Sequence, residues 1–307
     1  MTNGSNLPRI INSISELHRE LGLSKPLHPL VSLVNYADIA ADTTEIAKGM
    51  VLNFYKVSYK LHFSGKVRYG QGHYDFDEGG LSFIAPKQLI SAIDQEGDYS
   101  GYTLLFHPDF LIGQPLGRKI QKYDFFSYTS SEALYLSEKE KGVIIGIFKI
   151  IDTELHTSID HFSQEVILAQ IDLLLTYSKR FYNRQFITRQ SAGNPLLTRF
   201  EDLLTAYFAD EEGLAHGLPS VQYFADQLTV SPHYLSDMLR TVTGQNTQQH
   251  IHTRLITYAR DLLSTTELSV AEIAYRLGFE HPQSFSKLFR TKTKLSPLDF
   301  RQSFRQK

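Results

Sequence analysis

The last third of the chain contains the same two-helix pattern twice, and this repeat constrains the fold more than any other feature of the sequence. The clearer copy runs from Ser269 to Arg290. Its apolar residues recur at helical spacing, first at Val270, Ile273, Ala274 and Leu277 and then, after a short turn, at Phe285, Leu288 and Phe289. Gly278 follows the first set, at the point where a left-handed residue ends a helix and glycine adopts that conformation easily. The pattern predicts two short helices joined by a tight turn.

The second copy runs from Ser220 to Arg240, with one residue fewer in the turn. Its apolar and basic residues match the first copy in kind and spacing: Val221, Phe224, Ala225 and Leu228 in the first helix, and Leu235, Met238, Leu239 and Arg240 in the second. A proline suited to a first helical turn, Pro232 or Pro282, stands near the start of each second helix. Between the copies, residues 247–263 predict a single helix of roughly 25 Å. This length suits a helix that joins two units reading successive major grooves, which lie about 34 Å apart on one face of DNA.

The second helix of each copy has a polar outer face. In the clearer copy that face carries Gln283, Ser284, Ser286, Lys287 and Arg290. Amides, hydroxyls and cationic donors are the groups that contact base edges and phosphates in a DNA groove. Any surface helix is polar on its outer side, so amphipathicity alone does not show that a helix contacts DNA. The duplication favours a pair of helix-turn-helix units that read DNA.

The charge of the chain is small in total and uneven in distribution. The formal net charge is −2, which by itself does not favour a nucleic-acid partner. Residues 281–307 nevertheless hold seven Lys and Arg against one acid, whereas residues 199–280 hold five against eleven. We therefore predict that the second unit supplies more of the salt-dependent phosphate binding than the first.

These motifs resemble the AraC/XylS family of bacterial transcription regulators over about a third of the chain, from roughly Asn194 to the end. The residues that carry the resemblance are Arg254, Ala259, Arg260, Leu262 and Leu263 in the joining helix, followed by Ile273, Ala274, Leu277, Gly278, Phe279, Ser284, Phe285, Lys287, Phe289, Arg290 and Pro297. The resemblance implies that each second helix enters a major groove. It assigns this role to His233, Tyr234, Ser236, Asp237 and Arg240 in the first unit, and to Pro282, Gln283, Ser286, Lys287 and Arg290 in the second. Asp237 and Pro282 depart from the family pattern, which puts base reading at those two positions in doubt.

The N-terminal part predicts an antiparallel sandwich or jelly roll, because short alternating strands recur between turns. The expected strands begin at residues 28–39 and continue at Val51–Phe63, His73–Phe76, Leu81–Ala85, Gln88–Ile93, Gly101–Phe106 and Tyr123–Ser127. A short helix at Ile14–Leu23 is expected to be peripheral. This pattern fits the cupin-like barrel that many members of the family carry as an effector domain. The fold class is therefore α+β multidomain, with a cupin-like domain at 1–190 (barrel about 26–130, helices about 132–190) and an all-α domain at 191–307. The helix-turn-helix units are expected at about 218–241 and 268–291.

The expected barrel offers a candidate pocket for a small-molecule effector. Aromatic walls with hydroxyl groups would come from Tyr55, Tyr59, Tyr74, Phe83 and Tyr102. The same rings could equally fill a core, and the ligand cannot be identified, although sugars are one candidate by analogy with the family. His62, His73 and His107 are isolated, and His250 and His252 point to different faces of a helix, so we expect neither a metal site nor a cofactor.

Two long amphipathic helices, Glu138–Leu155 and Phe162–Phe186, follow the strands. By analogy with the family they are expected to pair two subunits in a homodimer, and packing onto the barrel is the alternative. Residues 189–195 read as a linker. With no Cys and no signal-like or membrane-spanning apolar run, a cytoplasmic protein is expected.

Three functions remain open at this point. The first is a regulator that binds promoter DNA and responds to an effector, with RNA polymerase as a further partner. The second is a ligand-independent dimeric regulator. The third is a cupin-type enzyme, which the lack of metal ligands and catalytic motifs disfavours, so no enzymatic activity is expected.

Overall fold

The computed structural model describes residues 8–39, 50–61, 79–90, 100–128, 132–157, 162–190, 195–209 and 217–305. The chain divides into two compact units, Met1–Gln185 and Phe186–Lys307. The linker predicted at 189–195 lies mostly outside the described ranges. Each unit is considered by itself below.

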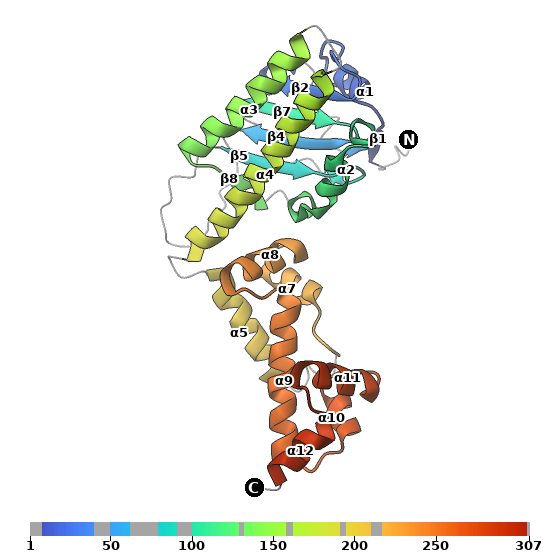
Figure 1. Ribbon diagram of the computed structural model, residues 1–307, viewed down its shortest axis with the longest axis vertical. Helices are drawn as coiled ribbons and strands as arrows, with labels where there is room; N and C mark the ends of the chain where they lie inside the picture. Colours follow the sequence, from blue (N-terminus) through green and yellow to red (C-terminus); the bar gives the residue numbers. More distant parts are fainter. Residues whose placement is uncertain are drawn as a thin grey trace, which may run out of the picture. The chain divides into compact units, whose positions relative to one another are not determined.

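The first unit contains two open sheets (Figure 1). The smaller sheet has the order β1-β3-β6, formed by Arg9–Ile11, Met50–Leu52 and Leu89–Ile90. The larger has the order β2-β7-β4-β5-β8, formed by Val31–Asn35, Gly101–Phe106, Tyr55–Lys60, Gly80–Ile84 and Leu134–Tyr135. Neighbouring strands are antiparallel except for the parallel pair β1 and β3. The sheet-containing domain is confirmed, but the strands in the described ranges do not close into a cupin-like barrel.

Several expected strands differ from the structure. The single strand predicted at Val51–Phe63 is wrong, because the chain breaks at Asn53 and Phe54 and its halves β3 and β4 join different sheets. The Asn53 side-chain amide donates to Asn12 Oδ1 over 2.7 Å, and its backbone N–H donates to the Ile11 carbonyl, which holds the break in place. Residues 124–127 form a 3₁₀ helix instead of a strand. The strand expected at His73–Phe76 and the end of the one at Gln88–Ile93 lie outside the described residues.

The two faces of the larger sheet pack against different layers. On one face, Tyr102 contacts Phe148 of α3 (Glu138–His156), and Phe83 contacts Tyr182 of α4 (Ser163–Gln190). In Figure 1 both helices run across the strands. On the other face, Leu105 joins a buried cluster with the smaller sheet and with α1 (Ile14–Glu20). Since α1 buries Ile14 and Leu17 in this cluster, the expectation that this helix is peripheral is wrong.

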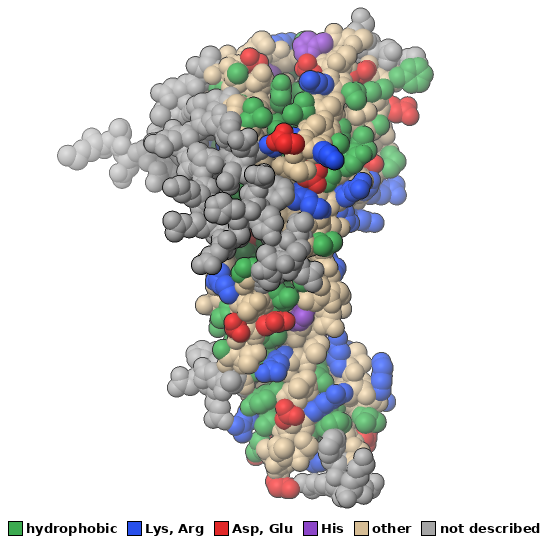
Figure 2. Space-filling model, turned by 90° about the vertical axis from the view of Figure 1, so that its left-hand side faces the viewer, with side chains coloured by type: hydrophobic (Ala, Val, Ile, Leu, Met, Phe, Trp, Pro, Cys, Tyr) green, Lys and Arg blue, Asp and Glu red, His purple; other side chains and the backbone are tan. Residues whose placement is uncertain are grey.

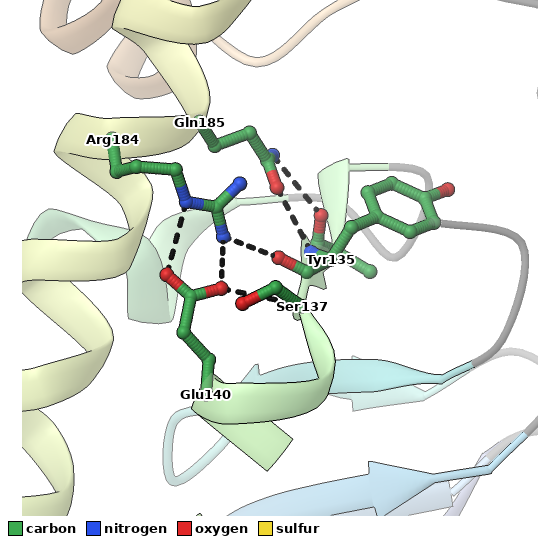
Figure 3. A network of polar contacts seen from close by, with 6 residues as sticks. Tyr135, Ser137, Glu140, Arg184 and Gln185 are labelled. Atoms are coloured by element: carbon green, nitrogen blue, oxygen red, sulfur yellow. Dashed lines mark hydrogen bonds and ion pairs between the residues drawn. The ribbon is translucent and has the colours of Figure 1, made fainter. Parts of the chain in front are cut away.

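A polar network fixes the C-terminal half of α4 against β8 and the start of α3 (Figure 3). The Arg184 guanidinium donates to both carboxylate oxygens of Glu140, over 3.0 and 2.6 Å, and to the Tyr135 carbonyl over 2.8 Å. Glu140 also accepts from the Ser137 backbone N–H in a capping box that starts α3. A bidentate, partly buried pair of this kind resists exchange with water. The network accounts for the ordered register of α4 on the sheet.

Short helical segments complete the first unit between β7 and β8: η3 (Pro108–Leu111), α2 (Pro115–Lys119), η4 (Ile120–Lys122) and η5 (Asp124–Ser127), with η1 (Tyr36–Asp38) directly after β2. The second unit is helical throughout its described ranges. Its helices are α5 (Pro195–Ala209), α7 (Val221–Leu228), α8 (Pro232–Thr243), α9 (Thr247–Thr265), α10 (Val270–Arg276), α11 (Pro282–Thr293) and α12 (Pro297–Arg305).

Candidate nucleic-acid interface

The second unit contains two helix pairs of the same construction, α7 with α8 and α10 with α11, joined by α9 (Figure 1). In each pair a serine caps the first helix: the side chain of Ser220 accepts from the Tyr223 N–H, and that of Ser269 from the Glu272 N–H. α9 has 19 residues, which corresponds to about 28 Å. The structure thus has a pair of helices at each copy of the sequence repeat.

The turns between the paired helices are also equivalent. Thr229 (φ 57°) ends α7 and Gly278 (φ 83°) follows α10, both in the left-handed conformation. In each turn the next backbone N–H bonds back over 3.0 Å, from Val230 to the Ala225 carbonyl and from Phe279 to the Ala274 carbonyl. This closure is the helix end that the sequence predicts at Gly278.

Gly278 has a second role, because it lies against the backbone of Gly217. A Cβ at position 278 would be 2.4 Å from the Gly217 carbonyl carbon. The Gly217 carbonyl oxygen also accepts a 2.9 Å hydrogen bond from the Tyr207 hydroxyl of α5. The segment before the first helix pair therefore packs directly on the turn of the second, and only glycine leaves the room for it.

Buried aromatic and aliphatic side chains hold α8 and α11 in place. Leu235 and Leu239 of α8, and Phe285 and Phe289 of α11, are fully buried. The opposite sides of the two helices are therefore directed outward. The exposed predicted residues are His233, Arg240, Gln283, Ser284, Lys287 and Arg290, and the half-buried ones are Pro282, Ser236, Asp237 and Ser286.

Tyr234 differs from the other predicted contact residues. Its side chain is only 1% exposed, and its ring packs edge-on against Phe186, which belongs to the same unit. A buried ring cannot reach a groove without leaving its packing site. Tyr234 therefore belongs to the core beneath α8, and we omit it from the outer face.

The outer faces of α8 and α11 carry different charges at matching positions. In α8, Asp237 Oδ1 accepts a 2.8 Å bond from Arg240 Nη1, so the arginine is paired within its own helix. In α11 the position of Asp237 is taken by Lys287, and Arg290 matches Arg240. The α11 face thus presents two cations where the α8 face presents an internal ion pair. Figure 2 shows a different side of the second unit, on which Lys and Arg side chains also lie at the surface.

Polar contacts tie α8 to α9, and α12 to the end of α9. Ser236 Oγ lies 3.1 Å from Oγ1 of the fully buried Thr247, which ties α8 to α9. Arg301 of α12 donates to the carbonyls of Leu263 and Leu268, over 3.3 and 2.6 Å, and so ties α12 to the end of α9 and the loop after it. Ser236 is thereby engaged in packing as well as lying near the outer face.

The aromatic residues predicted to line an effector pocket lie mainly in a core. Phe83 and Tyr102 pack toward the helical layer over one face of the larger sheet, and Tyr59 on the same face is fully buried. Tyr55 stacks on Phe106 and borders a surface cavity of about 570 Å³. Tyr74 lies outside the described residues. Tyr59 and Phe83 are therefore core residues, Tyr102 is half-buried against the helical layer, and Tyr55 borders the cavity.

Histidine is a common metal ligand, so the surroundings of the histidines bear on whether the chain could bind a metal ion. No group of three or more His, Asp or Glu within the described ranges could hold a metal ion. His250 Nε2 lies 2.8 Å from Thr243 Oγ1, and His252 Nε2 lies 2.9 Å from Gln248 Nε2. Burial lowers the pKa of both histidines. The ring of His250 also packs edge-on against Phe200 of α5. His62 and His73 fall outside the described residues, and His107 caps η3.

Sequence reasoning overlooked one polar cluster. Lys56, Ser58 and Lys60 of β4 face the side of the sheet opposite the aromatic residues, and Thr103 and Tyr36 join them there. The polar residues that alternate with apolar ones within Val51–Phe63 indicated that a polar face exists there, but the alternation was interpreted only as evidence for a strand.

None of the described helices has a stretch long and apolar enough to cross a membrane.

The geometry of the second unit defines a tandem helix-turn-helix domain. In agreement with this, residues 224–303 match a family described as a helix-turn-helix domain. The HTH-type transcriptional activator RhaS of Escherichia coli O1:K1 is 36% identical over 140 residues, which cover 46% of this chain and 46% of RhaS. The chain thus matches about half the length of its curated relatives.

Two solved structures are similar over part of this chain. The DNA-binding domain of AdpA, determined with a target DNA, is 30% identical, with 34% of this chain and 93% of that chain covered and a TM-score of 0.30. A transcriptional regulator from Chromobacterium violaceum, described as having an AraC-type DNA-binding domain, is 22% identical, with 38% and 97% covered and a TM-score of 0.33. On the family match and the similarity to RhaS, the C-terminal unit is a helix-turn-helix domain, and its motifs resemble those of the AraC/XylS family.

Proposed function

We propose that the chain is a sequence-specific regulator of transcription that binds double-stranded promoter DNA through α8 and α11. The observation that supports this most is the exposure of matching positions on two equivalent helices joined by one rigid helix. Such an arrangement suits two successive major grooves on one side of a duplex. The curated relatives are named as transcriptional activators, which also favours a regulator over an enzyme.

The exposed side chains suggest a division of roles. Gln283 can bond an adenine edge in bidentate fashion, whereas Lys287 and Arg290 suit phosphates or guanine. In α8, His233 and Arg240 are the exposed candidates, and Asp237 can accept from a cytosine amino group. Ser236, Ser284 and Ser286 can bond bases or phosphates. Pro282 contributes the first turn of α11 and no side-chain donor.

The first unit is proposed to be a cupin-like domain that pairs two subunits and senses an effector. Exposed apolar side chains on its helical layer, Ile150 of α3 and Leu173 of α4, favour a homodimer. A ligand-independent dimeric regulator is the second candidate, because the aromatic residues first expected to line a pocket pack as a core. RNA polymerase is a further proposed partner, and the cytoplasm the proposed location.

Selection from a random DNA pool tests the proposal. The full chain at a stated salt concentration is expected to enrich a defined sequence, and a reporter gene placed downstream of that sequence is expected to change its expression when the chain is produced. Enrichment of no sequence by the full chain or by residues 186–307 would refute DNA reading. If the chain bound the selected sequence tightly but expression of the reporter gene stayed constant, the chain would be a DNA-binding protein without a role in transcription.

A further inference from the structure

A polar cluster lies on the face of the larger sheet that turns away from α3 and α4. Strand β4 directs Lys56, Ser58 and Lys60 to this face, because alternate residues of a strand share a side. Thr103 of β7 is the register partner of Ser58. Tyr36 of η1, directly after β2, completes what we term the lysine–hydroxyl cluster.

The hydroxyl groups of the cluster form a chain. The Tyr36 hydroxyl donates to Ser58 Oγ over 2.9 Å, and Ser58 Oγ lies 3.1 Å from Thr103 Oγ1. Ser58 is 2% exposed and Thr103 is 3% exposed. Hydroxyl groups can reorient and can therefore donate to an acceptor that arrives from outside. The buried floor of the cluster is thus polar and adaptable.

The two lysines supply positive charge to this face of the sheet. Both side chains are half-buried, and among the described residues no acidic side chain forms an ion pair with either ammonium group. Leaving a partly desolvated ammonium group unpaired is unfavourable. An anion bound at this place would remove that cost.

The charges of both lysines act on the Tyr36 hydroxyl. Burial raises the pKa of this hydroxyl, but the nearby charge of Lys56, the hydrogen bond with Ser58, the charge of Lys60 and the hydrogen bond with Thr103 together outweigh burial, so the pKa is lowered. The two lysines are four residues apart on β4, a span of about 13 Å, with Ser58 between them on the same face.

We propose that the lysine–hydroxyl cluster binds the carboxylate or phosphate group of a small organic anion. Lys56 and Lys60 neutralise the anion, and one of the two hydroxyl groups of Ser58 and Thr103 donates a hydrogen bond to it, while the other donates within the chain. The inference deepens the effector-sensing part of the proposed function and rests on it for its biological meaning. It predicts a charged effector and disfavours a neutral sugar, since a sugar would leave both ammonium groups unpaired. The competing interpretation is that both lysines only extend their charged ends into water.

Thermal unfolding of the full chain tests the proposal without DNA. Sodium phosphate and sodium hexanoate serve as the two anionic probes, arabinose as a neutral probe, and sodium chloride at equal ionic strength as the reference. We expect phosphate or hexanoate to raise Tm above the chloride reference, because a ligand that binds only the folded chain stabilises it. The probe that acts identifies the preferred anionic group, and arabinose is expected to have no effect.

Four variants identify the site. K56Q and K60Q remove the charges and are expected to weaken probe binding by about tenfold or more. K56R keeps the charge, and K25Q removes an exposed lysine elsewhere in the first unit, so both are expected to bind like the wild type. If neither anion raises Tm, or if K56Q and K60Q bind as tightly as K25Q, the proposal is wrong. Because no step involves DNA, such a failure is separate from a failure of DNA binding.

Discussion

The unequal charge of the two reading helices leads to a quantitative prediction about salt. Each phosphate contact neutralised by a cation contributes about 0.9 to the slope of log K against log salt concentration. α11 exposes Lys287 and Arg290, whereas Arg240 of α8 is already paired with Asp237 over 2.8 Å. Replacing both α11 cations by Ala should therefore reduce the slope by about 1.8. Replacing Arg240 by Ala should reduce it by clearly less than 0.9, because that charge is partly neutralised before DNA arrives.

The assay is a fluorescence anisotropy titration of one labelled duplex, obtained by selection, at several salt concentrations. Asp237→Ala should have the opposite effect, since it releases Arg240 and should increase the slope by up to about 0.9. Lys139→Ala, which removes an exposed lysine from α3, serves as the matched control for loss of one positive charge. An unchanged slope in the Lys287→Ala/Arg290→Ala variant, or a lower slope in Asp237→Ala, would refute the charge asymmetry.

Two further predictions concern stability. Gly278→Ala should lower the free energy of unfolding by about 2–4 kcal/mol, because it combines left-handed strain with a Cβ at 2.4 Å from Gly217. Gly244→Ala is the control: Gly244 has φ 78° and no atom within 4 Å, so this change should cost only about 1 kcal/mol. Equal losses of the two variants in urea unfolding would contradict the prediction. Burial lowers the pKa of His250, so its neutral form stabilises the fold above the unfolded value of 6.5, and this contribution is lost as the pH falls through the lower folded pKa. The urea midpoint, followed by circular dichroism, should therefore fall between about pH 7.5 and pH 5.5, and less so in His250→Gln; an equal fall in both proteins would count against the assignment.

The helical unit could be predicted closely because its determinants are local. Helical spacing, the prolines at the first turns and Gly278 each specify structure within a few residues, and the repeat provides two independent readings of the same pattern. The burial of Tyr234 could not be predicted in this way, since it depends on Phe186, which lies far from it in the sequence. The ion pair of Asp237 with Arg240 was readable in principle from their spacing on a helix.

The sheets were predicted less well because strand pairing is not local. The alternating pattern from Val51 to Phe63 continues through Asn53 and Phe54, yet β3 and β4 pair in separate sheets. Alternation also cannot say which face of a strand meets the helices. For this reason Tyr59 and Phe83 were grouped as pocket candidates, while Lys56 and Lys60 on the opposite face were overlooked.

The central claim is that α8 and α11 read two half-sites in tandem, and paired selections from random DNA test it most directly. The wild type should enrich two half-motifs about 10.5 base pairs apart, centre to centre. His233→Ala should relax base preference in one half-motif, and Gln283→Ala in the other. If both variants altered the same half-motif, or if the wild type enriched only one, tandem reading would be contradicted.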